Sequence, residues 1–215
     1  AEWGGMSALE QLNLSNNRLS GTLPASIIGW ESLTTMRLAN NRFTGIMPAL
    51  TAKSLTTIAM ENNSFEGRLP EELSTSGLRV LTAEGNGLTG LPKLPRINTL
   101  RLGRNKIEFG SLEPNTSAKI FDYVPQDSIG NGGDTVVRVS SRVLIPSGIG
   151  GSKTVYQWLR NGRVLEGAAS PTLVLESARA FQSGVYMCRA TNKDLPQLTL
   201  FTRSYRLVVT GADQT

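Results

Sequence analysis

The first half of the chain repeats one pattern of apolar residues five times. Each frame reads apolar-x-x-apolar-x-apolar-x-x-Asn-x-apolar, as in Leu9-x-x-Leu12-x-Leu14-x-x-Asn17-x-Leu19. The five frames begin at Leu9, Leu33, Leu55, Leu78 and Ile97. The steps between them are therefore 24, 22, 23 and 19 residues. Repeats of this length stack into solenoids, in which each unit packs only on its neighbours.

The centre of each frame alternates apolar and polar residues, which is typical of a strand with one buried face. The asparagine follows at the point where the backbone must turn inward. The aligned asparagines are Asn17, Asn41, Asn63, Asn86 and Asn105. A buried amide can bond to main-chain groups of its own coil and of the neighbouring coil. We therefore predict one short parallel strand for each frame, and an asparagine ladder beside the strands.

A second signature follows the asparagine. It reads Leu19-Ser-Gly21-Thr-Leu23-Pro24, Phe43-Thr-Gly45-Ile46-Met47-Pro48 and Phe65-Glu-Gly67-Arg-Leu69-Pro70. With these residues the repeats resemble the plant-specific subclass of leucine-rich repeats, whose consensus continues L-x-G-x-I-P. The resemblance covers roughly residues 6–110. It implies a solenoid with short parallel β-strands and an irregular or 3-10 convex side, but a shared fold does not fix a binding site.

Residues 1–8 resemble the tail of an earlier repeat, because Gly5-Met6 stands before Leu9 as Gly29-Trp30 stands before Leu33. No polar cap precedes them, although the ends of a solenoid need capping. We expect the repeats to be truncated at the N-terminus. The first domain is assigned to residues 1–112.

After Ile107 the repeat stops. Residues 113–130 are assigned to a cap and linker, and residues 131–211 to a second domain. Six β-type runs follow, at 135–139, 142–145, 154–160, 172–175, 184–191 and 198–209. Turn signals such as Gly150-Gly151 and Asn161-Gly162 separate several of them, as expected of an all-β sandwich.

Two motifs make this second domain resemble an immunoglobulin-like sandwich. Tyr156-Gln-Trp158 is similar to that family's strand with the core tryptophan. Ser183-Gly184-Val-Tyr186-Met-Cys188 is similar to its tyrosine-corner strand, in which tyrosine precedes the second cysteine by two residues. The family's first cysteine would lie near Ile145. Because Cys188 is the single cysteine of the chain, we predict a core without a disulfide and a buried thiol.

The combination of modules resembles multidomain secreted or surface proteins of Bacteroidetes-type bacteria. It consists of the plant-type repeats, a linker from Leu112-Glu113-Pro114-Asn115 to Gly130, and the Y-Q-W domain. Animal receptors that join such repeats to immunoglobulin domains carry cysteine-rich caps, which are absent here. The bacterial resemblance implies secretion or surface display, with the signal peptide outside this chain.

Composition argues against enzymatic chemistry. The chain has no histidine and one cysteine, which removes the commonest general base and the commonest metal ligand. The net charge of +5 comes without the basic cluster that nucleic-acid binding needs. No apolar stretch is long enough to span a bilayer. We predict no catalytic residue, no cofactor and no metal site, and neither a nucleic-acid partner nor membrane insertion of this fragment.

The predicted recognition surface is the concave face of the repeats, formed by the outward residues beside each strand. The candidate ligand-binding residues are Gln11, Asn13, Thr35, Arg37, Thr57, Glu61, Thr82, Glu84, Thr99 and Arg101. Parallel strands lie about 4.8 Å apart, so five rows form a shallow trough on the order of 20 Å across. Arg37, Glu61, Glu84 and Arg101 could form ion pairs between rows. Glu61 and Glu84 lack the nearby aromatic residues that a sugar-cleaving site would need.

These features predict an extracellular protein- or glycan-binding adhesion module, with the immunoglobulin-like domain as a spacer or secondary contact. One alternative is a purely structural spacer segment of a larger adhesin. Another is a non-catalytic carbohydrate-binding appendage of a degradative enzyme. That role would need exposed aromatic platforms, whereas Trp30 and Trp158 are expected to lie in the two cores.

Overall fold

The structure is a computed structural model that describes residues 5–130 and 132–211. Its contacts divide the chain into unit 1, Ala1–Gln126, and unit 2, Asp127–Thr215. The expectation that residues 1–8 are the tail of an earlier repeat falls partly on residues 1–4, which lie outside the described residues. No helix in the described ranges is both long and apolar enough to cross a membrane.

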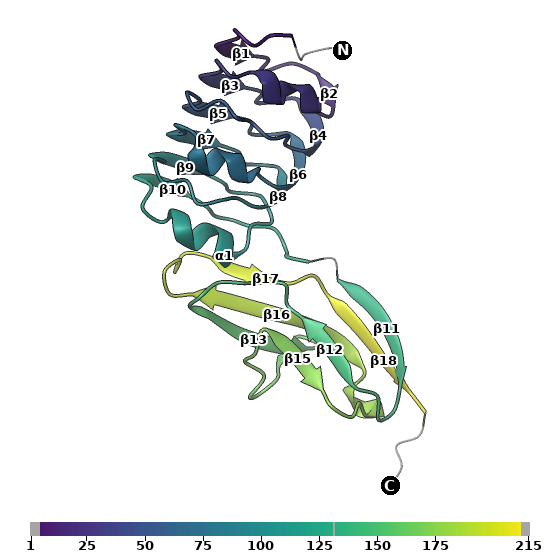
Figure 1. The fold of residues 1–215 in the computed structure, drawn as a ribbon. Coiled ribbons are helices and arrows are strands. Elements are labelled where there is room, and N and C mark those ends of the chain that lie inside the picture. Colours follow the sequence, from purple (N-terminus) through teal and green to yellow (C-terminus); the bar gives the residue numbers. More distant parts are fainter. Residues whose placement is uncertain (1–4, 131, 212–215) are drawn as a thin grey trace. The chain divides into compact units, whose positions relative to one another are not determined.

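Unit 1 is built on a parallel sheet with one short strand for each coil (Figure 1). In chain order the strands are β1 (Gln11–Asn13), β3 (Thr35–Arg37), β5 (Thr57–Ala59), β7 (Val80–Thr82), β9 (Thr99–Arg101) and β10 (Ile120–Asp122). The pairing is in register, so the central residues lie opposite one another from Leu12 in β1 to Phe121 in β10. The first five strands are those predicted from the frames.

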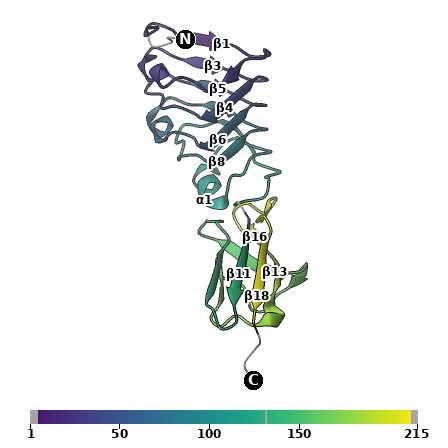
Figure 2. The same ribbon diagram turned by 90° about the vertical axis from the view of Figure 1, so that its right-hand side faces the viewer.

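The second signature forms a further parallel sheet of β2 (Ser20–Gly21), β4 (Arg42–Ile46), β6 (Ser64–Arg68) and β8 (Gly87–Gly90), which Figure 2 shows beside the first. Glycine is required here because Gly45 has φ +76°, and a Cβ on it would approach the Thr22 side chain to 2.8 Å. The rest of each coil is irregular or a short helix, as predicted. The helices are η1 (Ala25–Gly29), η2 (Glu71–Thr75), α1 (Phe109–Leu112) and η3 (Glu113–Asn115).

The predicted asparagine ladder is confirmed at four of its five residues. Asn17 is the exception, because it is exposed and its Nδ2 donates to Leu14 O and Ser15 O of its own coil. Asn105 is fully buried, and its Nδ2 donates to Leu102 O of its own coil and to Ala83 O of the preceding coil, both at 2.9 Å. Its Oδ1 accepts a hydrogen bond from Leu88 N at 2.9 Å. The same three bonds recur at Asn41, Asn63 and Asn86. Each ladder amide thus joins its own coil to the coil before it.

A sixth coil lies within residues 113–130, which were expected to form only a cap and linker. Gln126 takes the place of the ladder asparagine: its Nε2 donates to Tyr123 O at 2.7 Å and to Leu102 O at 2.9 Å, and its Oε1 accepts from Ile107 N at 2.8 Å. The underlying frame is Ala118-x-x-Phe121-x-Tyr123-x-x-Gln126. The sequence pattern missed it because alanine and glutamine replace the usual leucine and asparagine.

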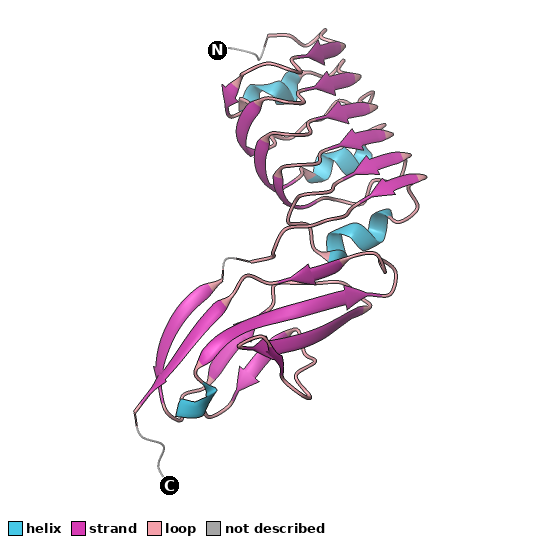
Figure 3. Ribbon diagram, turned by 180° about the vertical axis from the view of Figure 1, so that it is seen from behind, coloured by secondary structure: helices cyan, strands magenta, loops and turns pink. Residues whose placement is uncertain are grey.

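Unit 2 consists of two β-sheets (Figure 3). The larger one follows the order β11 (Gly133–Arg138), β18 (Tyr205–Thr210), β16 (Gly184–Asn192), β13 (Thr154–Arg160) and β14 (Arg163–Val164), and β17 (Thr199–Phe201) also pairs with β16. The smaller one pairs β12 (Val143–Pro146) with β15 (Thr172–Leu175), and η4 (Ala180–Gln182) precedes β16.

The strands of unit 2 fall on the predicted runs with two corrections. The short strand β14 was not predicted. The run predicted over 198–209 is divided into β17 and β18. Thr202 lies at the break, where its N–H donates to Cys188 O and its Oγ1 accepts from Cys188 N, each at 2.9 Å. Both the N–H and the C=O of Cys188 therefore bond to Thr202. The single strand predicted over 198–209 is interrupted at this residue, between β17 and β18.

The core of unit 2 contains the residues singled out from the sequence. Ile145, Trp158, Tyr186 and Cys188 belong to one buried cluster and are each at most 2% exposed. Trp158 and Cys188 lie opposite each other on β13 and β16, and the Tyr186 hydroxyl donates to Gln182 O at 2.5 Å. Cys188 is a buried free thiol, as predicted, and burial raises its pKa to about 11.

Candidate functional site

The outward side chains of the six-stranded sheet form two columns. We use the name sheet face for these two columns together with the turn residues that follow each strand. The register aligns Gln11, Thr35, Thr57, Val80, Thr99 and Ile120 in one column and Asn13, Arg37, Ala59, Thr82, Arg101 and Asp122 in the other. Eight of the ten predicted site residues lie in these columns. Glu61 and Glu84 follow two residues after the ends of β5 and β7.

Four of the predicted residues come together at one place on the sheet face. Glu61, Thr82, Glu84 and Arg101 line a hollow of about 380 Å³. The other lining residues are Asn62, Arg104, Asp122, Val124 and Pro125. The remaining predicted residues lie outside this hollow: Gln11, Asn13, Thr35, Arg37, Thr57 and Thr99. The structure thus concentrates the candidate site on the last four rows.

The ion pairs considered between rows are not formed. Ion pairs join Arg68 to Glu71, Arg142 to Glu176 and Lys153 to Asp194, and among the described residues no ion pair involves Arg37, Glu61, Glu84 or Arg101. Glu61 instead accepts a hydrogen bond from the Thr82 hydroxyl at 2.6 Å. The charges that face the hollow are therefore not neutralised by ion pairs within the fold.

A second ladder of side chains runs along the rim of the hollow. Asn40 donates to Asn16 Oδ1 at 2.7 Å, Asn62 donates to Asn40 Oδ1 at 2.8 Å, and the Arg104 guanidinium donates to Asn62 Oδ1 at 3.3 Å. Gly85 occupies the same position in the coil between those of Asn62 and Arg104, and a Cβ on it would come within 2.9 Å of Asn62 Oδ1. The missing side chain at Gly85 lets Arg104 reach across one coil, which places its charge at the hollow.

Sequence reasoning missed the contributions of Arg104 and Asp122. Arg104 could have been found from its position before a ladder asparagine. In chain order this position holds Asn16, Asn40, Asn62, Gly85 and Arg104. Four of these residues have φ between 55° and 60°, and Gly85 has φ +67°. Asp122 was missed because the sixth frame was not recognised. Both residues belong to the site through stacking of coils rather than through spacing along the chain.

The hollow combines three carboxylates, from Glu61, Glu84 and Asp122, with two guanidiniums, from Arg101 and Arg104. Such a surface suits a polar ligand that carries groups of both signs, because partner recognition depends on complementary charge. Over the described ranges, no three His, Cys, Asp or Glu residues cluster in a way that could hold a metal ion.

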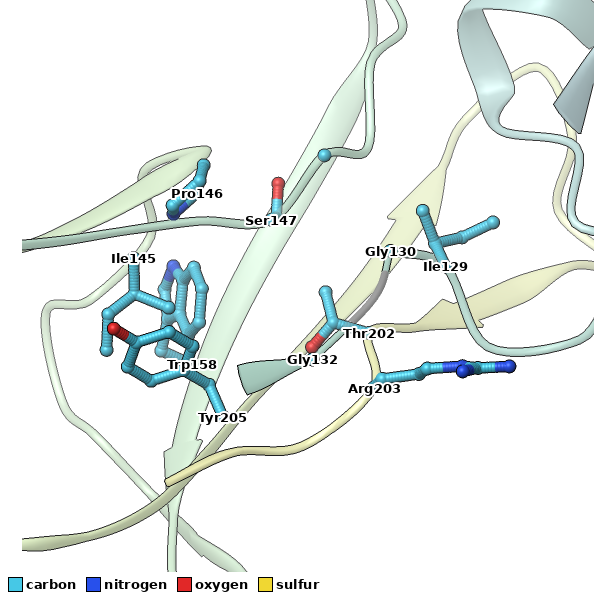
Figure 4. Close-up of a pocket in the computed structure, with 11 residues that line it drawn as sticks. Ile129, Gly130, Gly132, Ile145, Pro146, Ser147, Trp158, Thr202, Arg203 and Tyr205 are labelled. Atoms are coloured by element: carbon cyan, nitrogen blue, oxygen red, sulfur yellow. The ribbon is translucent and has the colours of Figure 1, made fainter. Parts of the chain in front are cut away.

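Unit 2 has a smaller and more apolar hollow of about 240 Å³ (Figure 4). Its lining includes Ile145, Trp158, Tyr205 and Ile129, and the hydroxyls of Thr135 and Tyr205 share a short hydrogen bond next to it. Trp158 is 1% exposed and its Nε1 donates to Ser170 O at 2.9 Å. The volume is below the range of about 300–1,000 Å³ that is usual for ligand pockets, so of these two hollows the one in unit 1 is the stronger candidate.

Comparison with known proteins gives a match to the Leucine Rich Repeat family over residues 8–30. No curated protein matches the sequence. Among solved structures, the leucine-rich-repeat ectodomain of the receptor kinase SOBIR1 from Arabidopsis thaliana is 24% identical, with a TM-score of 0.46 over 52% of this chain and 66% of that one. The chain therefore spans just under two thirds of that ectodomain.

InlP from Listeria monocytogenes is 15% identical, with a TM-score of 0.44 over 94% of this chain and 67% of that one. Extracellular domains 3–5 of Drosophila OTK are 14% identical, with a TM-score of 0.30 over 37% of this chain and 33% of that one. The family match and the parallel strands of unit 1, with few helices between them, fit a leucine-rich-repeat solenoid.

Proposed function

We propose that the chain is a non-enzymatic binding module that captures a protein or glycan partner on the sheet face of unit 1. The observation that carries the proposal is the mixed-charge hollow lined by Glu61, Thr82, Glu84, Arg101 and Asp122. Its charged groups take no part in the ion pairs of the described fold. A complementary partner therefore need not first break a salt bridge.

The dimensions of the sheet face are in keeping with a macromolecular partner. Six rows about 4.8 Å apart extend over about 24 Å, which is longer than the five-row trough expected from the sequence. Standard protein interfaces use roughly 20–30 residues a side. The two columns and the adjoining turns approach that number, with the hollow as the most strongly charged part.

We also propose that unit 2 is an immunoglobulin-like sandwich that acts as a spacer or secondary contact. Three features support this: two sheets packed around one core, Trp158 opposite Cys188, and the bond from the Tyr186 hydroxyl to Gln182 O. A tyrosine hydroxyl that bonds back to the main chain a few residues upstream is a hallmark of this family.

For the natural setting we propose a protein secreted by, or displayed on, a Bacteroidetes-type bacterium. The support comes from the combination of plant-type repeats with a Y-Q-W domain, and from residues 108–130, which follow the last predicted frame without a cysteine. A solenoid that binds a partner outside the cell would then serve adhesion.

The test compares two fourfold alanine variants of the full chain. The first changes Arg37, Glu61, Thr82 and Arg101 on the sheet face. The matched control changes Ser20, Arg42, Thr44 and Ser64, which are exposed on the second sheet of the same unit. Each protein is immobilised and probed with a glycan array and with extracted cell-surface proteins.

We expect the wild-type chain and the control to retain the same partner, and the sheet-face variant to lose it. Unchanged capture by the sheet-face variant would show that this surface is not the binding site. If the wild-type chain captures nothing, the chain is a structural spacer of a larger adhesin. If the sheet-face variant is still retarded on a polysaccharide affinity gel, another surface binds the polysaccharide. That result would favour a carbohydrate-binding appendage.

A further inference from the structure

The hairpin between β13 and β14 places two arginines directly opposite each other. Arg160 and Arg163 are cross-strand partners on either side of a two-residue turn. Asn161 and Gly162 form that turn with φ of 50° and 75°, the type I′ geometry that suits tight hairpins. Like charges in directly opposed positions destabilise a strand pair. Hairpin stability therefore does not explain this choice of residues.

Both arginines line a hollow. Arg160, Asn161, Arg163, Val164 and Leu165 line a hollow of about 470 Å³. In the described parts of the chain, neither arginine takes part in an ion pair. The local positive charge is thus not neutralised by the protein.

One arginine is held in place and the other is exposed. The Arg160 guanidinium donates to Phe181 O at 3.0 Å. Burial raises the pKa of the Tyr186 hydroxyl, and the nearby Arg160 guanidinium lowers it by a smaller amount. Arg163 is exposed at the edge of the sheet. A fixed cation beside an accessible one can close around a ligand with little reorganisation.

The backbone beneath the pair is firmly bonded. Asn161 N donates to Val185 O, and Val185 N donates to Asn161 Oδ1, both at 2.8 Å. On the other side of the turn, Leu165 N donates to Trp158 O at 2.9 Å. These bonds tie the hairpin to β16 and to the core strand, so the spacing of the two arginines is set by the fold.

We propose that this hairpin is an anion site that binds a doubly charged tetrahedral oxyanion, phosphate or sulfate, between Arg160 and Arg163. Directly opposite residues have Cβ atoms about 4.5–5.5 Å apart, so both guanidiniums can reach one ion. Each guanidinium presents parallel N–H donors that match two oxygens of such a group. Two positive charges match a dianion better than a carboxylate. The site belongs to unit 2 and is independent of the function proposed for unit 1.

The test is an NMR titration of the full chain at pH 8 with inorganic phosphate, sulfate or acetate, which reports on the arginine Nε–Hε signals. Arg163→Gln is the main variant, because it leaves the bond from Arg160 to Phe181 O in place. Arg163→Lys keeps the charge but removes the paired donors. Arg138→Gln is the matched control, since Arg138 is exposed on β11 and does not line the hollow.

We expect saturable shifts of the Arg160 and Arg163 signals with phosphate and with sulfate, and at least tenfold weaker binding of acetate. Arg163→Gln should weaken the binding of both dianions at least tenfold, Arg163→Lys should weaken it less, and Arg138→Gln should leave it unchanged. Equal weakening by Arg163→Gln and Arg138→Gln would mean diffuse attraction by a basic domain and would overturn the proposal. So would the absence of saturable shifts, or acetate binding as tight as that of phosphate.

Discussion

Replacing one ladder asparagine by alanine tests how the coils of unit 1 are held together. Asn105 is the best position, because its side chain is fully buried and its amide bonds to two coils. Asn105→Ala removes one acceptor and two donors at once. The effect depends on which of their partners keep another hydrogen bond.

The two carbonyls that bond to Asn105 each keep another hydrogen bond. Ala83 O also accepts from Asn86 Nδ2 at 3.1 Å, and Leu102 O also accepts from Gln126 Nε2 at 2.9 Å. Leu88 N–H, by contrast, donates to Asn105 Oδ1 and lies in a residue that is 0% exposed. A buried donor without a partner costs about 1–3 kcal/mol, and each lost bond about 0.5–1.5 kcal/mol. With one unpaired donor and two lost bonds, the variant should therefore lose about 2–6 kcal/mol of unfolding free energy.

Asn17→Ala is the matched control, because Asn17 is exposed and donates to Leu14 O and Ser15 O of its own coil. We expect it to lose less than about 1 kcal/mol. Urea unfolding gives both free energies, and amide hydrogen exchange followed by NMR reports on Leu88 N–H directly. Equal losses in the two variants, with Leu88 still protected in Asn105→Ala, would refute the ladder as the main link between coils.

Three further predictions concern the rim of the hollow and the core of unit 2. Gly85→Ala should lower the thermal stability of unit 1, because a Cβ at φ +67° would lie 2.9 Å from Asn62 Oδ1; unchanged melting followed by circular dichroism would contradict this. Cys188 has its pKa raised from 9.0 to about 11, so its contribution to stability is complete below about pH 9 and declines as the pH rises toward 11. The unfolding free energy, measured in urea, should therefore fall less between pH 8 and pH 10.5 for Cys188→Ala than for the wild type. An equal fall in the two proteins would contradict the raised pKa. Tyr186→Phe should lose about 1 kcal/mol of unfolding free energy in urea, because it removes the bond to Gln182 O, and no loss would mean that this bond adds nothing to stability.

The sequence predicted those parts of the fold that depend on local pattern. Period-two alternation located the first five strands of the sheet, and the spacing of Trp158 and Cys188 located the core of unit 2. The sixth coil escaped because Ala118 and Gln126 fulfil the structural roles of leucine and asparagine without matching the pattern. The break at Thr202 escaped because it depends on bonds to Cys188 in another strand.

The candidate site was predicted only in part, for a related reason. Glu61, Thr82, Glu84 and Arg101 were identified because the frame fixes which side chains point outward. Arg104 reaches the hollow by crossing Gly85 to Asn62. That path depends on which residues stack in neighbouring coils. A single-sequence pattern specifies rows well, but it does not show side chains that reach from one row to another.

The ladder also gives unit 1 a direction. Each ladder amide bonds to the coil before it. Leu88 N–H of one coil therefore gains its acceptor, Asn105 Oδ1, when the next coil folds, and Ile107 N–H gains Gln126 Oε1 in the same way. A ribosome delivers the coils in this order. During synthesis only the last coil made would have main-chain N–H groups that still lack an acceptor from the next coil. Folding can therefore keep pace with translation, each new repeat completing the one made before it.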